Sequence, residues 1–138
     1  MYIDLISSTY QEFQSRFSRF CDSVFRSITV QCDDISTGLE LRVSTRDLME
    51  KNNNGWVSLT LTISGVTDYR IYQQINTCGT LTYDGFHFIL DKEVVGIDFS
   101  GDYERAKSLT ELRHSIRYVV GKGIKYEVLP YGSFGEKQ

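Results

Sequence analysis

The side chains best suited to catalysis are few in this chain, and their spacing forms no familiar catalytic set. The sequence holds two histidines, His87 and His114, and three cysteines, Cys21, Cys32 and Cys78. A cysteine becomes a strong nucleophile when a base such as histidine lies beside it, and Cys78 with His87 is the one pair that suggests this chemistry. Nothing in the sequence places the two together, so a strand histidine and an ordinary thiol are the simpler interpretation. We therefore expect no catalytic residue.

Motifs that hold a metal ion or a phosphate group are also missing from the sequence. No C-x-x-C or H-x-x-x-H spacing of the kind that binds zinc occurs. The segment Gly121-Lys122-Gly123 resembles a phosphate contact only superficially. A helix would have to follow it to supply the amide donors, whereas the next residues alternate like a strand, so a hairpin turn fits better. We expect no metal and no cofactor.

Charge is distributed unevenly along the second half of the chain. Residues 84–104 carry six acids against one base, Lys92, and residues 105–125 carry six bases against one acid, Glu111. These segments could be solvated loop ends that pair with each other. They could instead present an acidic patch that attracts a basic protein and speeds encounter. On the second interpretation the candidate partner-binding residues are Asp84, Asp91, Glu93, Asp98, Asp102 and Glu104.

Asp98 is the candidate for which the sequence makes the most specific structural prediction. It lies between Ile97 and Phe99 in a run that alternates apolar and polar residues. Successive side chains of a strand point to opposite faces, so Asp98 has the parity opposite to its apolar neighbours. We expect its carboxylate to project from the sheet surface and to be free to meet a partner.

Length and composition favour a single domain, residues 1–138, with its own core. Apolar residues make up 41% and aromatic residues 13% of the chain, which is typical of a packed interior. The net charge of −3 argues against non-specific binding of nucleic acid, which needs a basic surface. No apolar run reaches the ~20 residues of a membrane span. With no basic leader pattern and an odd number of cysteines, we expect free thiols and a cytoplasmic location.

An amphipathic helix is predicted near the N-terminus. Ser8 with Gln11, and Thr9 with Glu12, have the spacing of capping boxes. Apolar residues then recur at spacings of three and four, which predicts a helix over about 8–25 with one apolar stripe. We expect this stripe to dock on a sheet, and partner binding is the alternative. Its members are Tyr10, Phe13, Phe17, Phe20 and Val24.

The rest of the chain alternates apolar and polar residues with the period of strands. We expect a turn at 91–93, an inward-facing strand over 95–99, and a short helix over 108–114 that begins at Ser108. The tail, 130–138, should fray. Four hairpins are predicted: 28–32 with 39–43, 56–64 with 67–75, 79–83 with 86–90 across Asp84-Gly85, and 116–120 with 124–128.

Together these elements predict an α+β fold. Short connections between successive strands favour an antiparallel meander of about seven strands. The sheet could be curved, closed into a sandwich, or rolled into a partly open barrel. The N-terminal amphipathic helix would pack on it, and a short helix would precede the last hairpin.

The strand pattern, size and acidity resemble those of small bacterial immunity proteins, which neutralise polymorphic or contact-dependent toxins. The segments that carry this resemblance are 56–61, leading to Gly65-Val66, and 118–128. It covers the middle and the C-terminal third of the chain. The resemblance implies a cytoplasmic, non-catalytic protein that binds one cognate toxin, and it carries over no binding residue.

Two other functions remain open at this point. A curved sheet could enclose a small-ligand or catalytic cavity lined by aromatic side chains. Alternatively, an exposed strand edge could join copies of the chain into an assembly, so monomer and homodimer are both possible. The aromatic candidates for a cavity are Tyr69, Tyr72, Tyr83, Phe86 and Phe88.

Overall fold

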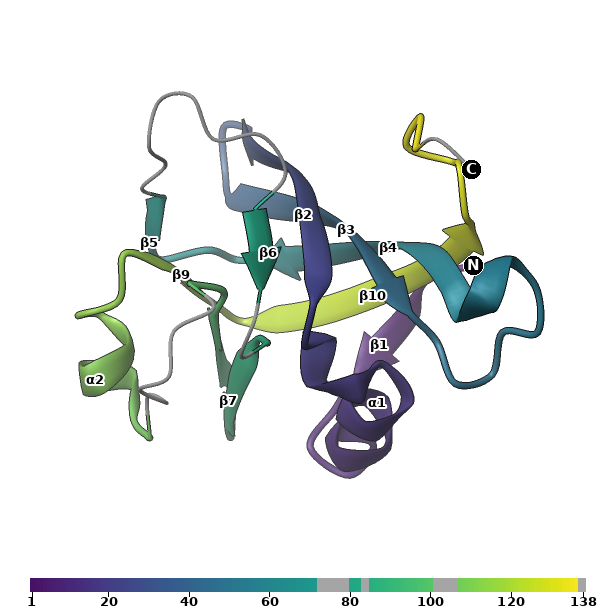
Figure 1. Ribbon diagram of the computed structural model, residues 1–138. Coiled ribbons are helices and arrows are strands. Elements are labelled where there is room, and N and C mark those ends of the chain that lie inside the picture. The colour runs from purple at the N-terminus through teal and green to yellow at the C-terminus, as the bar shows by residue number, and fades with distance from the viewer. Residues whose placement is uncertain (72–79, 83–84, 101–106, 137–138) are drawn as a thin grey trace.

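The computed structural model describes residues 1–71, 80–82, 85–100 and 107–136, and it shows an α+β fold (Figure 1). Two short α-helices, α1 (Tyr10–Arg16) and α2 (Leu109–Leu112), and two 3-10 turns, η1 (Ser18–Phe20) and η2 (Asn53–Gly55), accompany antiparallel strands. The strands are β1 (Ile3–Leu5), β2 (Ser23–Cys32), β3 (Thr37–Arg46), β4 (Trp56–Ser64), β5 (Asp68–Ile71), β6 (Thr80–Thr82), β7 (His87–Asp91), β8 (Val94–Asp98), β9 (Arg117–Gly121) and β10 (Gly123–Pro130).

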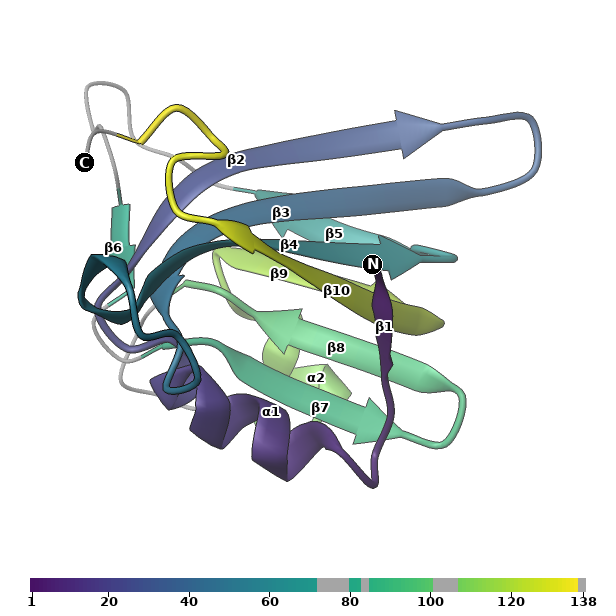
Figure 2. The same ribbon diagram turned by 90° about the vertical axis from the view of Figure 1, so that its right-hand side faces the viewer.

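The strands form two sheets with a shared core. The larger sheet has the order β1-β10-β4-β3-β2-β6, and the smaller has the order β5-β9-β8-β7. Figure 2 shows β7 and β8 beneath the large sheet and α1 beneath β7. Apolar residues at every second position of the central strands fill the space between the sheets, as their alternation predicts. Examples that are at most 1% exposed are Leu39, Leu41, Val43, Leu59, Leu61, Ile63, Ile97 and Val119.

The N-terminal helix is shorter than predicted. The α-helix ends at Arg16, and Val24 belongs to β2, so the predicted helix over 8–25 is wrong beyond its first half. Ser18, Arg19 and Phe20 have φ between 51° and 62°, which breaks the helix. This turn buries Phe20 as completely as Phe17 and releases the following residues to pair with β3. Tertiary packing therefore overrides the helical periodicity.

Docking of the phenylalanine stripe on the sheet is confirmed. The Phe13 ring lies 5.2 Å from Phe17 and 4.7 Å from Tyr126 of β10, measured between centroids. The predicted N-terminal capping boxes do not form, because Thr9 is the N-cap and its side chain makes no capping hydrogen bond. This helix is therefore held mainly by its buried aromatic face.

Two turns that the sequence predicts do reverse the chain. β2 pairs with β3 across 33–36, and β7 pairs with β8 across 92–93. The other three predicted hairpins do not form among the described strands, and residues 72–75, 79 and 83, which belong to two of these predictions, lie outside the described residues. β4 does not pair with β5, β6 does not pair with β7, and β9 does not pair with β10. In each case the chain passes from one sheet to the other.

Backbone contacts explain two of these crossings. Phe86 donates its N–H to the Arg19 carbonyl over 3.1 Å, so the chain after Gly85 is held by η1 and leads into β7. At Gly121 a Cβ atom would lie 2.6 Å from Ile63 Cγ2 and 2.8 Å from the Ser64 carbonyl. Only glycine permits the end of β9 to approach the end of β4 this closely.

A second, smaller core covers the outer face of the small sheet. α2 begins at Ser108, whose hydroxyl accepts the Glu111 N–H over 3.2 Å, which confirms the predicted capping residue. Leu109 and Leu112 pack over Gly96 of β8, where a Cβ atom would lie 2.6 Å from Leu112. This layer lies on the face of β8 to which both Gly96 and Asp98 belong.

The C-terminal tail lies against the large sheet through residue 136, where we had expected it to fray. The Glu136 carboxylate is buried and accepts hydrogen bonds from Ser44 over 2.8 Å and from Ser58 over 2.6 Å. Trp56 and Tyr131 make a ring contact in the same region. Among the described helices none is long and apolar enough to cross a membrane.

Candidate functional site

The predicted acidic residues do not come together as one described patch. Asp91 and Glu93 are exposed at the β7–β8 turn, with Lys92 between them. Asp84, Asp102 and Glu104 lie outside the described residues. The acidic-patch hypothesis therefore stands on two turn residues and on three positions for which there is no structural description.

Asp98 does not project into solvent, and this expectation is wrong. Only 4% of the residue is exposed. Its Oδ1 accepts hydrogen bonds from the Ser100 N–H, the Ser100 hydroxyl and the Ser115 hydroxyl over 2.7–3.0 Å. The parity was predicted correctly, but the segment that follows α2 covers this outer face. Asp98 is an internal acceptor that ties β8 to the residues before β9.

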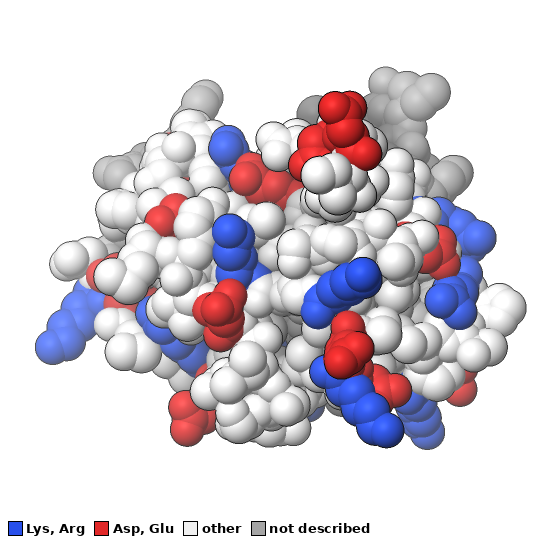
Figure 3. Space-filling view, turned by 180° about the vertical axis from the view of Figure 1, so that it is seen from behind, with Lys and Arg blue, Asp and Glu red and all other residues white. Residues whose placement is uncertain are grey.

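A hollow of about 650 Å³ opens between the β1–β10 edge and the β7–β8 turn. Its charged lining is mixed, because two acids, Asp4 and Asp91, face three lysines. Figure 3, which views the molecule from behind, shows positive and negative side chains interspersed over the face seen there. Such a surface provides no single-sign field to attract a charged partner. The lysines are Lys92, Lys122 and Lys125.

A second hollow, of about 490 Å³, has a different character, and we call it the N-terminal groove. It is lined by Ile3, Asp4, Leu5, Ile6, Thr9, Glu12, Phe13, Ser15, Arg16, Leu48, Met49 and Tyr126. The buried rings of Phe13 and Tyr126 contribute its inner surface. Four apolar side chains around it are exposed by 45–73%: Ile3, Ile6, Leu48 and Met49. Exposed apolar side chains gathered at one hollow are typical of a protein-binding surface.

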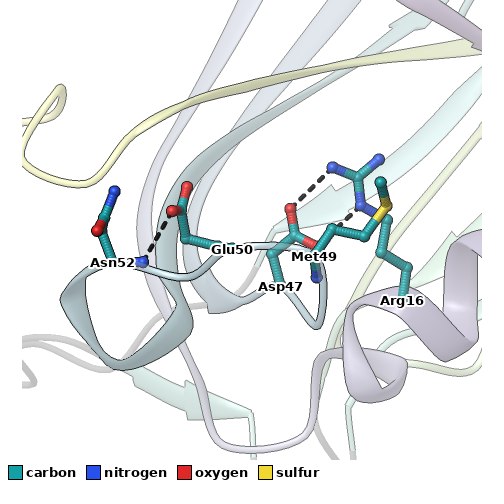
Figure 4. Close-up of polar contacts among 5 residues, drawn as sticks. All are labelled: Arg16, Asp47, Met49, Glu50 and Asn52. Carbon is teal, nitrogen blue, oxygen red and sulfur yellow. Dashed lines mark hydrogen bonds and ion pairs between the residues drawn. The ribbon is translucent and has the colours of Figure 1, made fainter.

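One ion pair fixes the wall of this groove. Arg16, at the end of α1, donates from Nε to Asp47 Oδ1 over 2.9 Å and from Nη2 to Oδ2 over 2.8 Å (Figure 4). Asp47 Oδ1 also accepts the Met49 N–H, and the Leu48 N–H donates to the Arg16 carbonyl. The Glu50 carboxylate accepts the Asn52 N–H over 3.0 Å, and the Glu50 N–H donates to the Asp47 carbonyl. The pair therefore holds Leu48 and Met49 in place while their side chains remain in solvent.

Electrostatically the groove is acidic. The hydrogen bond to Asp47 raises the pKa of Arg16, against the opposing effect of desolvation, so the two charges remain paired. No described residue forms a hydrogen bond or ion pair with the side-chain carboxylate of Asp4 or Glu12. Lys125 is opposite Asp4 in the ladder, but its ammonium lies 4.8 Å from the centre of the Tyr2 ring. Two unpaired carboxylates therefore flank an apolar hollow.

Sequence reasoning missed this groove because its walls come from segments far apart in the chain. The sequence predicts a polar loop over 44–55, with one helical turn over 47–51 as an option, and the structure has this loop from Asp47 onward because β3 continues to Arg46. The available signal was a Leu-Met pair inside an otherwise polar stretch. Its significance depends on the contact between Asp47 and Arg16, which are 31 residues apart.

The described part of the chain gives no support to a Cys78–His87 pair, a metal site or an aromatic-lined cavity. Cys78 lies outside it, and Cys21 and Cys32 are free and exposed. No three histidine, cysteine or acidic side chains in the described ranges are placed to hold a metal ion. Of the predicted cavity aromatics, Phe86 and Phe88 pack into the core, Tyr69 is exposed, and Tyr72 and Tyr83 are not described.

Comparison with known proteins identifies no relative. No family model matches the chain, and no curated protein and no solved structure matches it either. The function is therefore inferred from the residues of this chain alone.

Proposed function

We propose that this protein is a non-catalytic binding module that neutralises a cognate bacterial toxin domain in the cytoplasm, like the immunity proteins that its strand pattern resembles. The observation that carries the proposal is the N-terminal groove. Leu48 and Met49 are 73% and 70% exposed, although an ion pair and two backbone hydrogen bonds hold their loop in place. Ordered apolar side chains in solvent cost free energy unless a partner covers them.

The chemistry of the groove also indicates the kind of partner. Its apolar lining favours a partner that buries aliphatic or aromatic side chains, and the unpaired Asp4 and Glu12 favour basic residues beside them. A basic toxin domain has both features. Asp91 and Glu93 could meet the same partner from the β7–β8 turn and would then mainly affect the association rate.

The test is protection of cells from any toxin that a gene neighbouring that of this chain encodes. Co-expression should rescue growth, and the purified proteins should form a complex. A Met49→Glu variant should fold normally and lose both properties. The matched control is Ile35→Glu, because Ile35 is 95% exposed in the β2–β3 turn and does not line the groove. Equal protection by both variants would exclude the groove as the interface.

A further inference from the structure

The strand β1 has an open edge beside the N-terminal groove. It pairs with β10 through Ile3, Asp4 and Leu5, and no described strand pairs with its other side. In an antiparallel ladder, alternate residues direct their N–H and C=O groups toward the paired strand, and the residues between direct theirs away. β1 therefore presents backbone donors and acceptors that a further strand could use.

The side chains along this edge line the two hollows described above. Asp4, Leu5 and Ile6 line both the N-terminal groove and the hollow beside the β7–β8 turn. A chain lying along β1 would thus have space for its side chains. Ile3 and Ile6, which are 45% and 53% exposed, lie next to it and would be covered.

Features that protect sheet edges from other chains are sparse here. Natural edge strands often carry lysine or proline, or are covered by a loop. β1 has the sequence Ile-Asp-Leu and contains neither residue. Its only charge is the Asp4 carboxylate, which has no hydrogen-bond or ion-pair partner among the described residues and would attract a basic chain rather than repel it.

On the basis of the function proposed above, we propose that the partner binds by strand addition. A segment with alternating apolar and basic residues lies along the free edge of β1. Its backbone pairs with β1, its apolar side chains enter the N-terminal groove, and its basic side chains lie beside Asp4 and Glu12. This mode combines main-chain hydrogen bonds for affinity with side-chain pockets for specificity.

The probe for this mode is a seven-residue peptide that alternates lysine and valine, added to the full-length protein. Binding should slow hydrogen exchange at one or more amides of residues 3–5. The same peptide with N-methyl groups on alternate residues lacks the donors for a ladder and should lose binding. Asp4→Asn and Glu12→Gln should each weaken binding about two- to fivefold at low salt.

Two peptide results would overturn strand addition and leave the proposed function intact. One is that the N-methylated peptide binds equally well, with exchange at residues 3–5 unchanged, which would mean that the groove recognises side chains only. The other is that the peptide does not bind at millimolar concentration while the toxin domain does. A homodimer in light scattering, with these amides protected before any peptide is added, would also overturn it, because a second copy would then occupy the edge.

Discussion

Arg16 and Asp47 form a two-point ion pair that joins the end of α1 to the loop after β3. The Asp47 side chain is 3% exposed and that of Arg16 is 24% exposed. Replacing Asp47 with alanine leaves the guanidinium and the Met49 N–H without their acceptor. We expect the unfolding free energy to fall by about 3 kcal/mol. This is the lower end of the range for a broken buried ion pair, because the Arg16 side chain remains partly exposed to solvent.

Denaturant unfolding measures this loss. The control is Glu40→Gln, which removes the more exposed Arg42–Glu40 pair and should cost less than about 1 kcal/mol. Equal costs for the two variants would show that the Arg16–Asp47 pair contributes no more than a surface contact.

Leu48 and Met49 should matter for binding and not for folding. Because both are at least 70% exposed, replacing either with glutamate should change the unfolding free energy by no more than about 0.5 kcal/mol. Affinity for the toxin domain should fall sharply, since an unpaired charge would have to be buried in the complex. Calorimetric titration of each variant provides the measurement. Unchanged affinity would place the interface elsewhere on the molecule.

Asp98 should matter for folding. Asp98→Ala removes the acceptor of three hydrogen bonds in a buried region, which should cost about 1–3 kcal/mol. Asp91→Ala removes the same charge from an exposed turn and should leave thermal stability nearly unchanged. If Asp98→Ala unfolded at the temperature of the parent protein, the buried hydrogen bonds would contribute little.

Glu136 should make docking of the tail depend on pH. Desolvation alone would raise its pKa, but hydrogen bonds from Ser58, Ser44 and the Phe134 N–H outweigh it and lower the pKa below 4.5. A carboxyl group with a lowered pKa stabilises the folded state above its unfolded pKa, and this contribution disappears as the pH falls through the folded value. The tail should therefore be docked at neutral pH and loosen in acid.

Trp56 fluorescence can follow this change, because Trp56 is the only tryptophan and its ring contacts Tyr131 in the tail. The parent protein should show a transition below about pH 4.5, and Glu136→Gln should remove it. Glu12→Gln, at an exposed carboxylate far from the tail in sequence, serves as the control. A transition that survives in Glu136→Gln would have to come from another group.

Gly121 should resist substitution. A methyl group there would meet Ile63 and the Ser64 carbonyl, so Gly121→Ala should destabilise the protein by about 1–3 kcal/mol. Gly38→Ala is the matched control, since its nearest contact, the Ile63 carbonyl, would lie at an ordinary 3.7 Å. Chemical denaturation measures the unfolding free energy of the two variants. An equal loss in both would show that the close contact at Gly121, where the chain crosses between the sheets, does not require glycine.

The candidate site was harder to predict from the sequence than the fold, because the site depends on contacts between residues far apart in the chain. Alternation in β3 and β4 was enough to assign their inward faces, because neighbouring residues of a strand point to opposite sides. The same rule gave the correct parity for Asp98 and the wrong exposure, since α2 and the segment after it cover the outer face. The groove could not be found this way, because Ile3, Arg16 and Met49 meet only in the folded chain.

By itself the sequence determined the α+β class, the antiparallel strands, the docking of the phenylalanine stripe and the cap of α2. These features follow from local periodicity and from hydrogen bonds between residues close in the chain. Only the tertiary structure decided that the chain crosses from one sheet to the other near Gly65, Gly85 and Gly121. A glycine allows either a tight reversal or a close crossing, and which one forms depends on the distant residues it meets, such as Arg19 for Gly85 and Ile63 for Gly121.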